Sequence, residues 1–157
     1  MPTFSYIGMY RHSLRFCTDA RQFLFTSEAH VNLVRTQIQR SANENAFAVI
    51  AYCFMPDHLH LLIEGTNPDS DCKKFIARSK QYSGFQFARE FQTRLWQRYG
   101  FERVLRDCES TTVVARYIVN NPIRAGLATR VQDYPFVGSL AYTLDELLEF
   151  IQFADGQ

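Results

Sequence analysis

Hydrophobic and polar positions divide the chain into short apolar runs and amphipathic segments. Apolar residues alternate with polar ones within residues 5–17, as in a strand that buries one face. Residues 46–55 form a continuous apolar run, and residues 58–64 form a second strand after a Met-Pro-Asp turn at residues 55–57. Because so short a turn joins them, we expect these two strands to form an antiparallel hairpin.

Helical periodicity predicts helices over residues 26–42, 70–92, 109–121 and 144–153. The third is expected to end at Pro122, because the residue before a proline disfavours helical backbone angles. Residues 95–105 are a candidate for a further strand. No linker, internal repeat or low-complexity segment interrupts the chain, so we expect one domain over residues 1–157. This order of elements favours an α+β domain with a mostly antiparallel sheet over a doubly wound parallel sheet.

Composition places the chain among globular proteins. It has 157 residues, of which 46% are hydrophobic and 21% charged, which excludes disordered and collagen-like chains. No apolar run is long enough to span a bilayer, and the N-terminus lacks the apolar core of a signal peptide. We therefore expect a cytoplasmic protein with no membrane partner. The four cysteines, at positions 17, 53, 72 and 108, form no CxxC motif and are expected to be buried or incidental thiols.

Charge is unevenly distributed along the chain. The net charge is only +1, but residues 73–130 hold 12 basic and 4 acidic side chains, a net charge of +8. Residues 1–72 carry a net charge of −2, and residues 131–157 carry −5. Such asymmetry suggests an anionic partner, although a solvated helix face would produce the same pattern.

His58 and His60 are the first candidates for chemistry. Residues two apart on a strand point to the same face, so the two imidazoles would stand side by side. Neutral imidazoles in pairs suit a divalent metal. The alternative is that they are two polar residues on an ordinary half-exposed strand, and the motif alone leaves both interpretations open.

Tyr117 and Asn121 are the second pair of candidates. They are four residues apart, so on a helix they would share one face. A tyrosine hydroxyl can act as a covalent nucleophile, and an asparagine oxygen can bind a hard cation. The alternative is a capped helix end, with Pro122 ending the helix and Arg124 on the surface.

Taken together, several blocks of residues resemble the single-tyrosine HUH transposases, and within them the branch of REP-associated tyrosine transposases. The blocks are residues 51–63 (AYCFMPDHLHLLI), 95–98 (LWQR) with 104–107 (VLRD), 117–127 (YIVNNPIRAGL) and 133–136 (DYPF). The resemblance runs from about residue 5 to residue 142. Two departures are the order of residues in Gln97-Arg98-Tyr99-Gly100, and Phe136 where the branch often has Trp.

The resemblance implies a ferredoxin-like α+β domain that is an enzyme. In it, His58 and His60 would hold Mg²⁺ or Mn²⁺, with Asn121 as the third ligand. Tyr117 would attack a DNA phosphodiester, form a 5′-phosphotyrosine link and release a 3′-hydroxyl. Such an enzyme nicks and rejoins single-stranded DNA at or near hairpins such as REP elements, as in DNA transposition. The protein would act as a monomer or homodimer and would be nucleoid-associated when bound to DNA.

Basic residues of the central region are the expected DNA contacts. Phosphate-binding candidates are Lys73, Lys74, Arg78, Lys80, Arg98, Arg106 and Arg124, and Trp96 is a candidate for base stacking. The alternative for Trp96 is a core residue, since large aromatic side chains dominate protein cores.

Two other functions remain open at this point. The low total charge and the departures fit a domesticated protein that binds hairpin DNA without transposition activity. A metal-dependent nuclease that hydrolyses DNA with water is the other, and only the tyrosine enzyme would form a covalent protein–DNA adduct.

Overall fold

The computed structural model describes residues 6–98 and 110–155, with side chains as far as Gln152. The helices and strands are β1 (Arg11–Cys17), α1 (Glu28–Asn45), β2 (Phe47–Met55), β3 (His58–Gly65), α2 (Cys72–Phe91), α3 (Thr111–Val119), α4 (Asn121–Arg124), β4 (Val137–Gly138) and α5 (Leu144–Asp155). Short 3-10 helices lie at Asp19–Arg21 and Val131–Asp133. Within these described ranges, no helix is long and apolar enough to cross a membrane.

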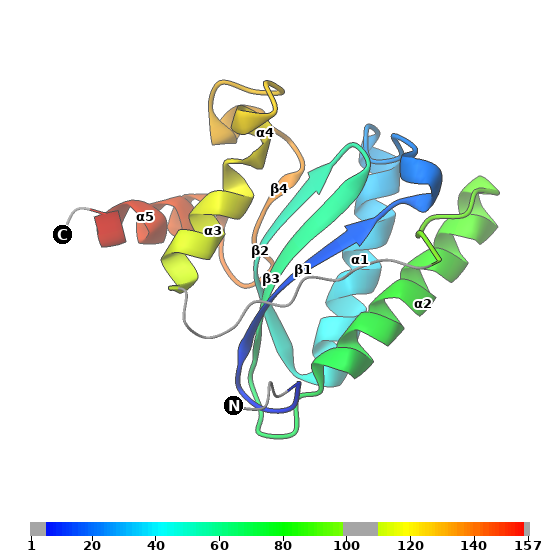
Figure 1. Cartoon of the computed structure of the whole chain (residues 1–157), viewed down its shortest axis with the longest axis horizontal. Coiled ribbons are helices and arrows are strands. Elements are labelled where there is room, and N and C mark those ends of the chain that lie inside the picture. The colour runs from blue at the N-terminus through cyan, green and yellow to red at the C-terminus, as the bar shows by residue number, and fades with distance from the viewer. Residues whose placement is uncertain (1–5, 99–109, 156–157) are drawn as a thin grey trace.

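In the described part of the chain, four strands form one sheet in the order β1-β3-β2-β4, and each neighbouring pair is antiparallel (Figure 1). Helix α1 connects β1 to β2, and β3 lies between these two strands. The order β-α-β-β-α, followed later by a fourth strand, is that of a ferredoxin-like domain. The predicted α+β class, antiparallel sheet and hairpin are confirmed.

Strand β4 was not predicted from the sequence. It consists only of Val137 and Gly138, which lie opposite Cys53 and Tyr52 of β2. Two residues are too few to show an alternating pattern, so only the pairing with β2 identifies this strand.

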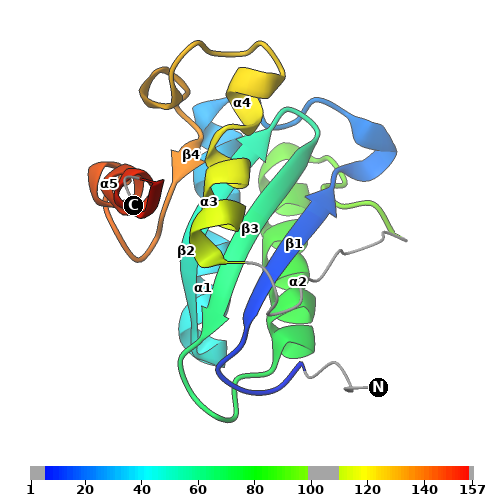
Figure 2. The ribbon, with the colours of Figure 1, turned by 60° about the vertical axis from the view of Figure 1, so that its left-hand side comes forward.

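Helices cover both faces of the sheet. Helices α1 and α2 pack on one face, and α3 and α5 lie on the other (Figure 2). Along β3, Leu59 and Leu61 point into the first layer and Leu62 points into the second. Both faces of β2 are buried as well, which explains its continuous apolar sequence.

Side-chain caps start the long helices close to the predicted positions. The cap oxygens of Ser27, Asp71 and Ser110 accept from the backbone N–H groups of His30, Lys74 and Val113 at 3.2, 3.3 and 3.1 Å. Helices α1 and α2 end at Asn45 and Phe91, and the cap residues that follow, Ala46 and Gln92, have left-handed φ angles of 58° and 50°. The predicted helices over 26–42, 70–92 and 144–153 are confirmed, with ends shifted by at most three residues.

The prediction of one helix over 109–121 that ends at Pro122 is wrong in its details. Helix α3 already ends at Val119, and Asn120 connects it to the single turn of α4. Pro122 lies in the first turn of α4, where its missing N–H would have no helical partner in any case. Tyr117 and Asn121 therefore belong to two successive helices.

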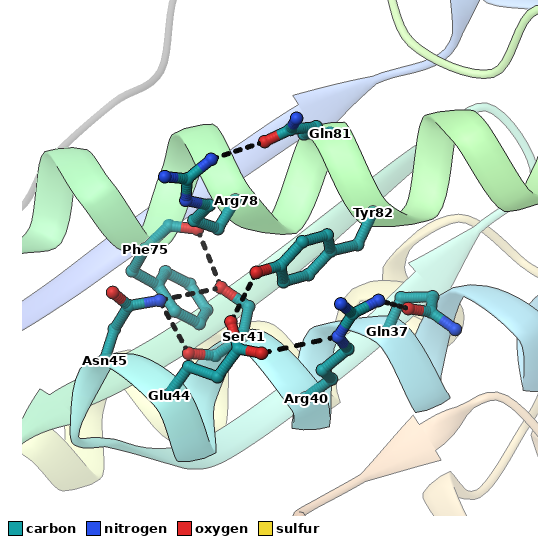
Figure 3. A network of polar contacts seen from close by, with 9 residues as sticks. All are labelled: Gln37, Arg40, Ser41, Glu44, Asn45, Phe75, Arg78, Gln81 and Tyr82. Atoms are coloured by element: carbon teal, nitrogen blue, oxygen red, sulfur yellow. Dashed lines mark hydrogen bonds and ion pairs between the residues drawn. The ribbon is translucent and has the colours of Figure 1, made fainter.

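Polar contacts hold α1 against α2 (Figure 3). The buried Ser41 hydroxyl donates to the Phe75 carbonyl at 3.1 Å. The Tyr82 hydroxyl donates to the Glu44 carboxylate, and the Arg40 guanidinium lies over the Tyr82 ring at 3.7 Å. These contacts join α1 and α2 into one layer that covers one face of the sheet.

The candidate strand over 95–105 lies largely outside the described residues. In its described part, Trp96 forms a single antiparallel bridge with Thr18 just after β1. The Trp96 side chain is 6% exposed and packs edge-on against Phe16. Its indole N–H donates to the Ser83 hydroxyl at 2.8 Å. Trp96 is therefore a core residue, as the alternative interpretation held, and we assign it no base-stacking role.

Replacing Trp96 should reduce stability without reducing DNA affinity. We expect Trp96→Ala to lower the unfolding free energy by about 3–5 kcal/mol, because it empties a large buried site. Urea unfolding measures this, and Phe23→Ala is the control, because Phe23 is 70% exposed. The milder variant Trp96→Phe should keep the affinity of the folded protein for single-stranded DNA. Unchanged stability together with weaker DNA binding would show that Trp96 contacts a base.

Candidate functional site

Strand β3 places His58 and His60 side by side on the face of the sheet that α3 covers. The residue between them, Leu59, is buried in the opposite layer. The Nε2 atoms of the two imidazoles lie 3.1 Å apart, and the ring planes are inclined at 85°. The same-face arrangement expected from a strand is therefore what the structure has.

Asp57 orients this pair from the hairpin turn. The His58 Nδ1 lies 2.6 Å from the Asp57 carboxylate, to which Arg21 donates at 2.9 Å. Donation from Nδ1 leaves Nε2 of His58 as an acceptor directed at His60. Sequence reasoning treated Asp57 only as a turn residue. Its position directly before the two histidines was the available signal, because ligating histidines commonly donate to a carboxylate.

Both imidazoles are neutral at pH 7. Burial lowers the pKa of His58, and the hydrogen bond to Asp57 opposes this effect only in part. Burial also lowers the pKa of His60 to about 3, and the neighbouring charges of His58, Arg15 and Arg124 act in the same direction. Neutral rings keep a nitrogen lone pair for a cation, which a protonated ring cannot offer.

The geometry of the pair fits a metal. Two nitrogens bound about 2.1 Å from one ion at a right angle are separated by about 3.0 Å, close to the observed 3.1 Å. Cys53 lies opposite His60 on β2, but burial raises the pKa of its thiol to about 12, so it is a poor ligand. Among the described residues, no cluster of three His, Cys, Asp or Glu side chains could hold an ion. A further protein ligand would therefore have to be another residue type, such as an amide.

Tyr117, Asn121 and Arg124 form a second group, at the junction of α3 and α4. Tyr117 is 59% exposed, and the Arg124 guanidinium lies 3.9 Å from the centre of its ring. Nη2 of Arg124 also donates to the Tyr117 carbonyl and, at 2.9 Å, to Oδ1 of Asn121. Arg124 is close enough to the histidines to lower the pKa of His60. Arg124 therefore contacts Tyr117 and Asn121 and acts on His60 through its charge, a role that the sequence did not indicate.

The basic candidates lie mainly along α2. Lys73, Lys74 and Arg78 are exposed on this helix, and the Lys80 ammonium lies 5.1 Å from the Phe16 ring centre. Arg98 is exposed in the segment after α2, whereas Arg106 lies outside the described residues. Most of the described basic candidates therefore lie on the α2 side of the sheet, and Arg124 lies on α4.

A groove of about 640 Å³ runs between α2 and residues 92–98, and we call it the α2 groove. Its polar lining includes Lys80, Gln81, Gln92, Arg94, Gln97 and Arg98. The backbone N–H of Gln97 donates to the Cys17 carbonyl at 3.0 Å, and Cys17 lies opposite His58. Neighbouring strands are about 4.8 Å apart, so one end of the groove lies about 10 Å from the His58 backbone.

The opposite end of β3 is acidic. Glu64 lines a cavity of about 540 Å³ together with Glu146 and Glu149 of α5. A polyanion would be repelled there and attracted at the end that carries Arg15 and the α2 groove.

Stability should depend on pH through His60. Its pKa is about 3 in the folded chain and about 6.5 in the unfolded chain, so the unfolded chain binds more protons between these values. The contribution of neutral His60 to stability is therefore fully present above pH 6.5 and is lost progressively as the pH falls toward 3. With a chelator present, we expect the unfolding free energy to drop by about 1–2 kcal/mol from pH 7 to pH 5. In urea titrations, His60→Gln should remove most of this drop. If the drop is unchanged in the variant, the fold does not keep His60 unprotonated.

Comparisons with known proteins show the family and the fold. The family described as IS200-like transposases matches residues 6–121. A curated protein of Haemophilus influenzae, described as a candidate REP-associated tyrosine transposase, is 26% identical over 118 residues, covering 68% of this chain and 67% of that protein.

Two solved structures share the fold. One is a REP-associated tyrosine transposase bound to a REP hairpin, with a TM-score of 0.70 and 20% identity over 87% of this chain and 81% of that one. The other is a candidate transposase from Deinococcus radiodurans, with a TM-score of 0.55 and 23% identity over 76% of this chain and 96% of that one. The family match spans both the histidine pair on β3 and the Tyr117–Asn121 segment, and the chain therefore belongs to the family of IS200-like transposases.

Proposed function

We propose that this chain nicks and rejoins single-stranded DNA at hairpins, with a divalent cation and a covalent 5′-phosphotyrosine intermediate. The observation that carries the proposal is the pair of neutral imidazoles, whose Nε2 atoms lie 3.1 Å apart beside an orienting carboxylate. The family and the similar protein found bound to a REP hairpin support DNA as substrate and a hairpin as its context.

His58 and His60 would hold the cation, Mg²⁺ or Mn²⁺, with Asn121 as a further ligand. A cation bound there would act as a Lewis acid on the scissile phosphate. Asp57 keeps the His58 ring oriented, and Arg21 keeps Asp57 ionised: burial alone would raise the pKa of Asp57, but hydrogen bonds from His58 and Arg21 hold it below its ordinary value. Asp57 and Arg21 thus hold the His58 ring in position before a cation binds.

Tyr117 supplies the nucleophile. Its oxygen attacks the phosphorus of a phosphodiester, and the bond from phosphorus to O3′ breaks. The 5′-phosphate remains on the tyrosine, the phenol proton is lost, and O3′ takes up a proton as it leaves. Attack by a 3′-hydroxyl reverses the exchange and rejoins a strand, because the covalent link preserves the phosphodiester bond energy.

The surroundings of four other tyrosines support the choice of Tyr117. Tyr134 and Tyr82 donate their hydroxyl protons to the Phe54 carbonyl and to Glu44. The Tyr52 hydroxyl accepts from Arg35 in the core, and Tyr142 lines the acidic cavity. Tyr117 combines an exposed ring with a neighbouring guanidinium, which suits a side chain that must reach a phosphate.

The α2 groove is the proposed path for DNA that flanks the scissile phosphate. It offers an ammonium group, two guanidinium groups and several amides, and one end lies near the backbone of His58, whose side chain points to the other face of the sheet. Exposed bases can bond to amide side chains, and phosphates bind the cations.

Tyr117→Phe should abolish covalent chemistry and preserve binding. The variant loses one oxygen and keeps an exposed ring, so stability should change by less than about 0.5 kcal/mol. With Mn²⁺ and a labelled hairpin carrying a single-stranded flank, a denaturing gel should show a protein–DNA adduct for wild type and none for the variant. Tyr142→Phe, another exposed tyrosine, is the matched control and should form the adduct.

The same gel separates the other two functions. Binding without cleavage by wild type would indicate a domesticated hairpin-binding protein, and cleavage without an adduct would indicate a hydrolytic nuclease. An adduct that persists in Tyr117→Phe would show that another residue is the nucleophile.

Neutralising the α2 groove should weaken DNA binding in a salt-dependent way. For Lys80→Gln combined with Arg94→Gln, we expect lower affinity for single-stranded DNA and a salt slope shallower by about 0.7 for each phosphate that the variant no longer neutralises. Titrations at several salt concentrations measure both. Arg40→Gln is the control, since Arg40 pairs with Glu44 on α1 and should leave the slope unchanged. If the double variant keeps the salt slope of the wild type, DNA does not bind in the α2 groove.

A further inference from the structure

We propose that Arg124 is a latch that couples DNA binding to metal binding. In the free chain its guanidinium holds Oδ1 of Asn121, and a DNA phosphate that takes over the guanidinium releases this oxygen for the cation. The inference rests on the proposed function, because it concerns the site in which Asn121 and the histidines bind the ion.

Three contacts hold Arg124 against Tyr117 and Asn121, although its long side chain could extend into solvent. Its guanidinium covers the Tyr117 ring at 3.9 Å and donates to both the Tyr117 carbonyl and Asn121 Oδ1. The Tyr117 carbonyl lies in the last turn of α3, where carbonyls lack donors from their own helix. The break between α3 and α4 therefore creates the acceptor that fixes Arg124 in place.

The Asn121 amide is held in one orientation at a cost. Its Oδ1 accepts from Arg124 at 2.9 Å, while its Nδ2 is buried with no hydrogen-bond partner among the described residues. A buried donor without a partner is energetically unfavourable. Turning the amide by 180° would place the oxygen in the buried position, but Nδ2 would then face the Arg124 donors. Arg124 thus opposes the orientation in which the oxygen is free for a cation.

A phosphate is the ligand that can compete for Arg124. Guanidinium groups bind phosphate oxygens in a bidentate, charge-assisted manner, which is stronger than donation to neutral amide and carbonyl oxygens. Arg124 already lies within electrostatic range of His60, so a phosphate at the histidine pair would be within its influence. Release would free the Asn121 oxygen and uncover the Tyr117 ring in one step. Linkage then requires that DNA and metal strengthen each other's binding by the same factor.

The test measures Mn²⁺ affinity with and without a single-stranded oligonucleotide, in a Tyr117→Phe background that prevents cleavage. For the protein with Arg124 intact, we expect the oligonucleotide to tighten Mn²⁺ binding by about 5- to 20-fold, a usual size for such coupling. Arg124→Lys keeps the positive charge but loses the guanidinium group that donates to both the Tyr117 carbonyl oxygen and Asn121 Oδ1. It should bind Mn²⁺ several-fold more tightly without DNA and show little further gain with DNA.

Arg15→Lys is the matched control. Arg15 lies opposite His60 on β1 and contributes to the same electrostatic field, but it belongs to a different element from Asn121. This variant should keep both the Mn²⁺ affinity and the coupling. If Arg124→Lys behaves like Arg15→Lys, the latch is wrong and Arg124 acts only through its charge.

One further variant separates the latch from the proposed metal site. His58→Ala should lose most Mn²⁺ affinity with or without DNA. If it does not, the proposed metal site itself is wrong. If His58→Ala loses affinity while Arg124→Lys keeps full coupling, the metal site stands and the latch is overturned.

Discussion

The site depends on the position of β3 in the middle of a sheet that is covered on both faces. Pairing with β1 and β2 fixes the register of this strand on both sides, so His58 lies between Cys17 and Met55. Leu59 and Leu61 fill the layer shared with α1 and α2, and a slip by one residue would place both in the wrong layer. The apolar residues of β3 therefore determine the direction in which the histidines point.

Burial gives these histidines their chemical state. Burial lowers the pKa of both rings. The positive charge of Arg15 adds to the effect on both, and that of Arg124 adds to the effect on His60. Without a carboxylate, a buried imidazole could adopt either tautomer, and Asp57 removes that freedom for His58. Because Asp57 is in the hairpin turn, the connection between β2 and β3 both fixes the register and orients the first ring.

The second half of the site is built differently, on short helices with exposed polar side chains. Buried residues such as Ala115 and Ile118 hold α3 against the sheet, while Tyr117 points away from this core. The break at Asn120 then starts α4, which brings Arg124 back onto the preceding turn. The two histidines, which are the proposed ligands, are thus held rigidly, whereas Tyr117, Asn121 and Arg124 are held by a few polar contacts that a ligand can replace.

The sequence by itself determined the β2–β3 hairpin, the long helices and the pairing of His58 with His60, because periodicity and turn residues are local properties. It placed the start of the first strand too early, since β1 begins at Arg11. It also indicated Tyr117 and Asn121, through spacing and the resemblance of whole blocks. It could not determine β4, the core position of Trp96 or the role of Asp57, since each depends on partners from other elements such as β2 and Ser83. It also misplaced the helix end at Pro122, because proline is compatible both with ending a helix and with starting one. Only the tertiary structure brought Arg124, which donates to Asn121, within electrostatic range of His60, because the two residues lie on a short helix and on a distant strand.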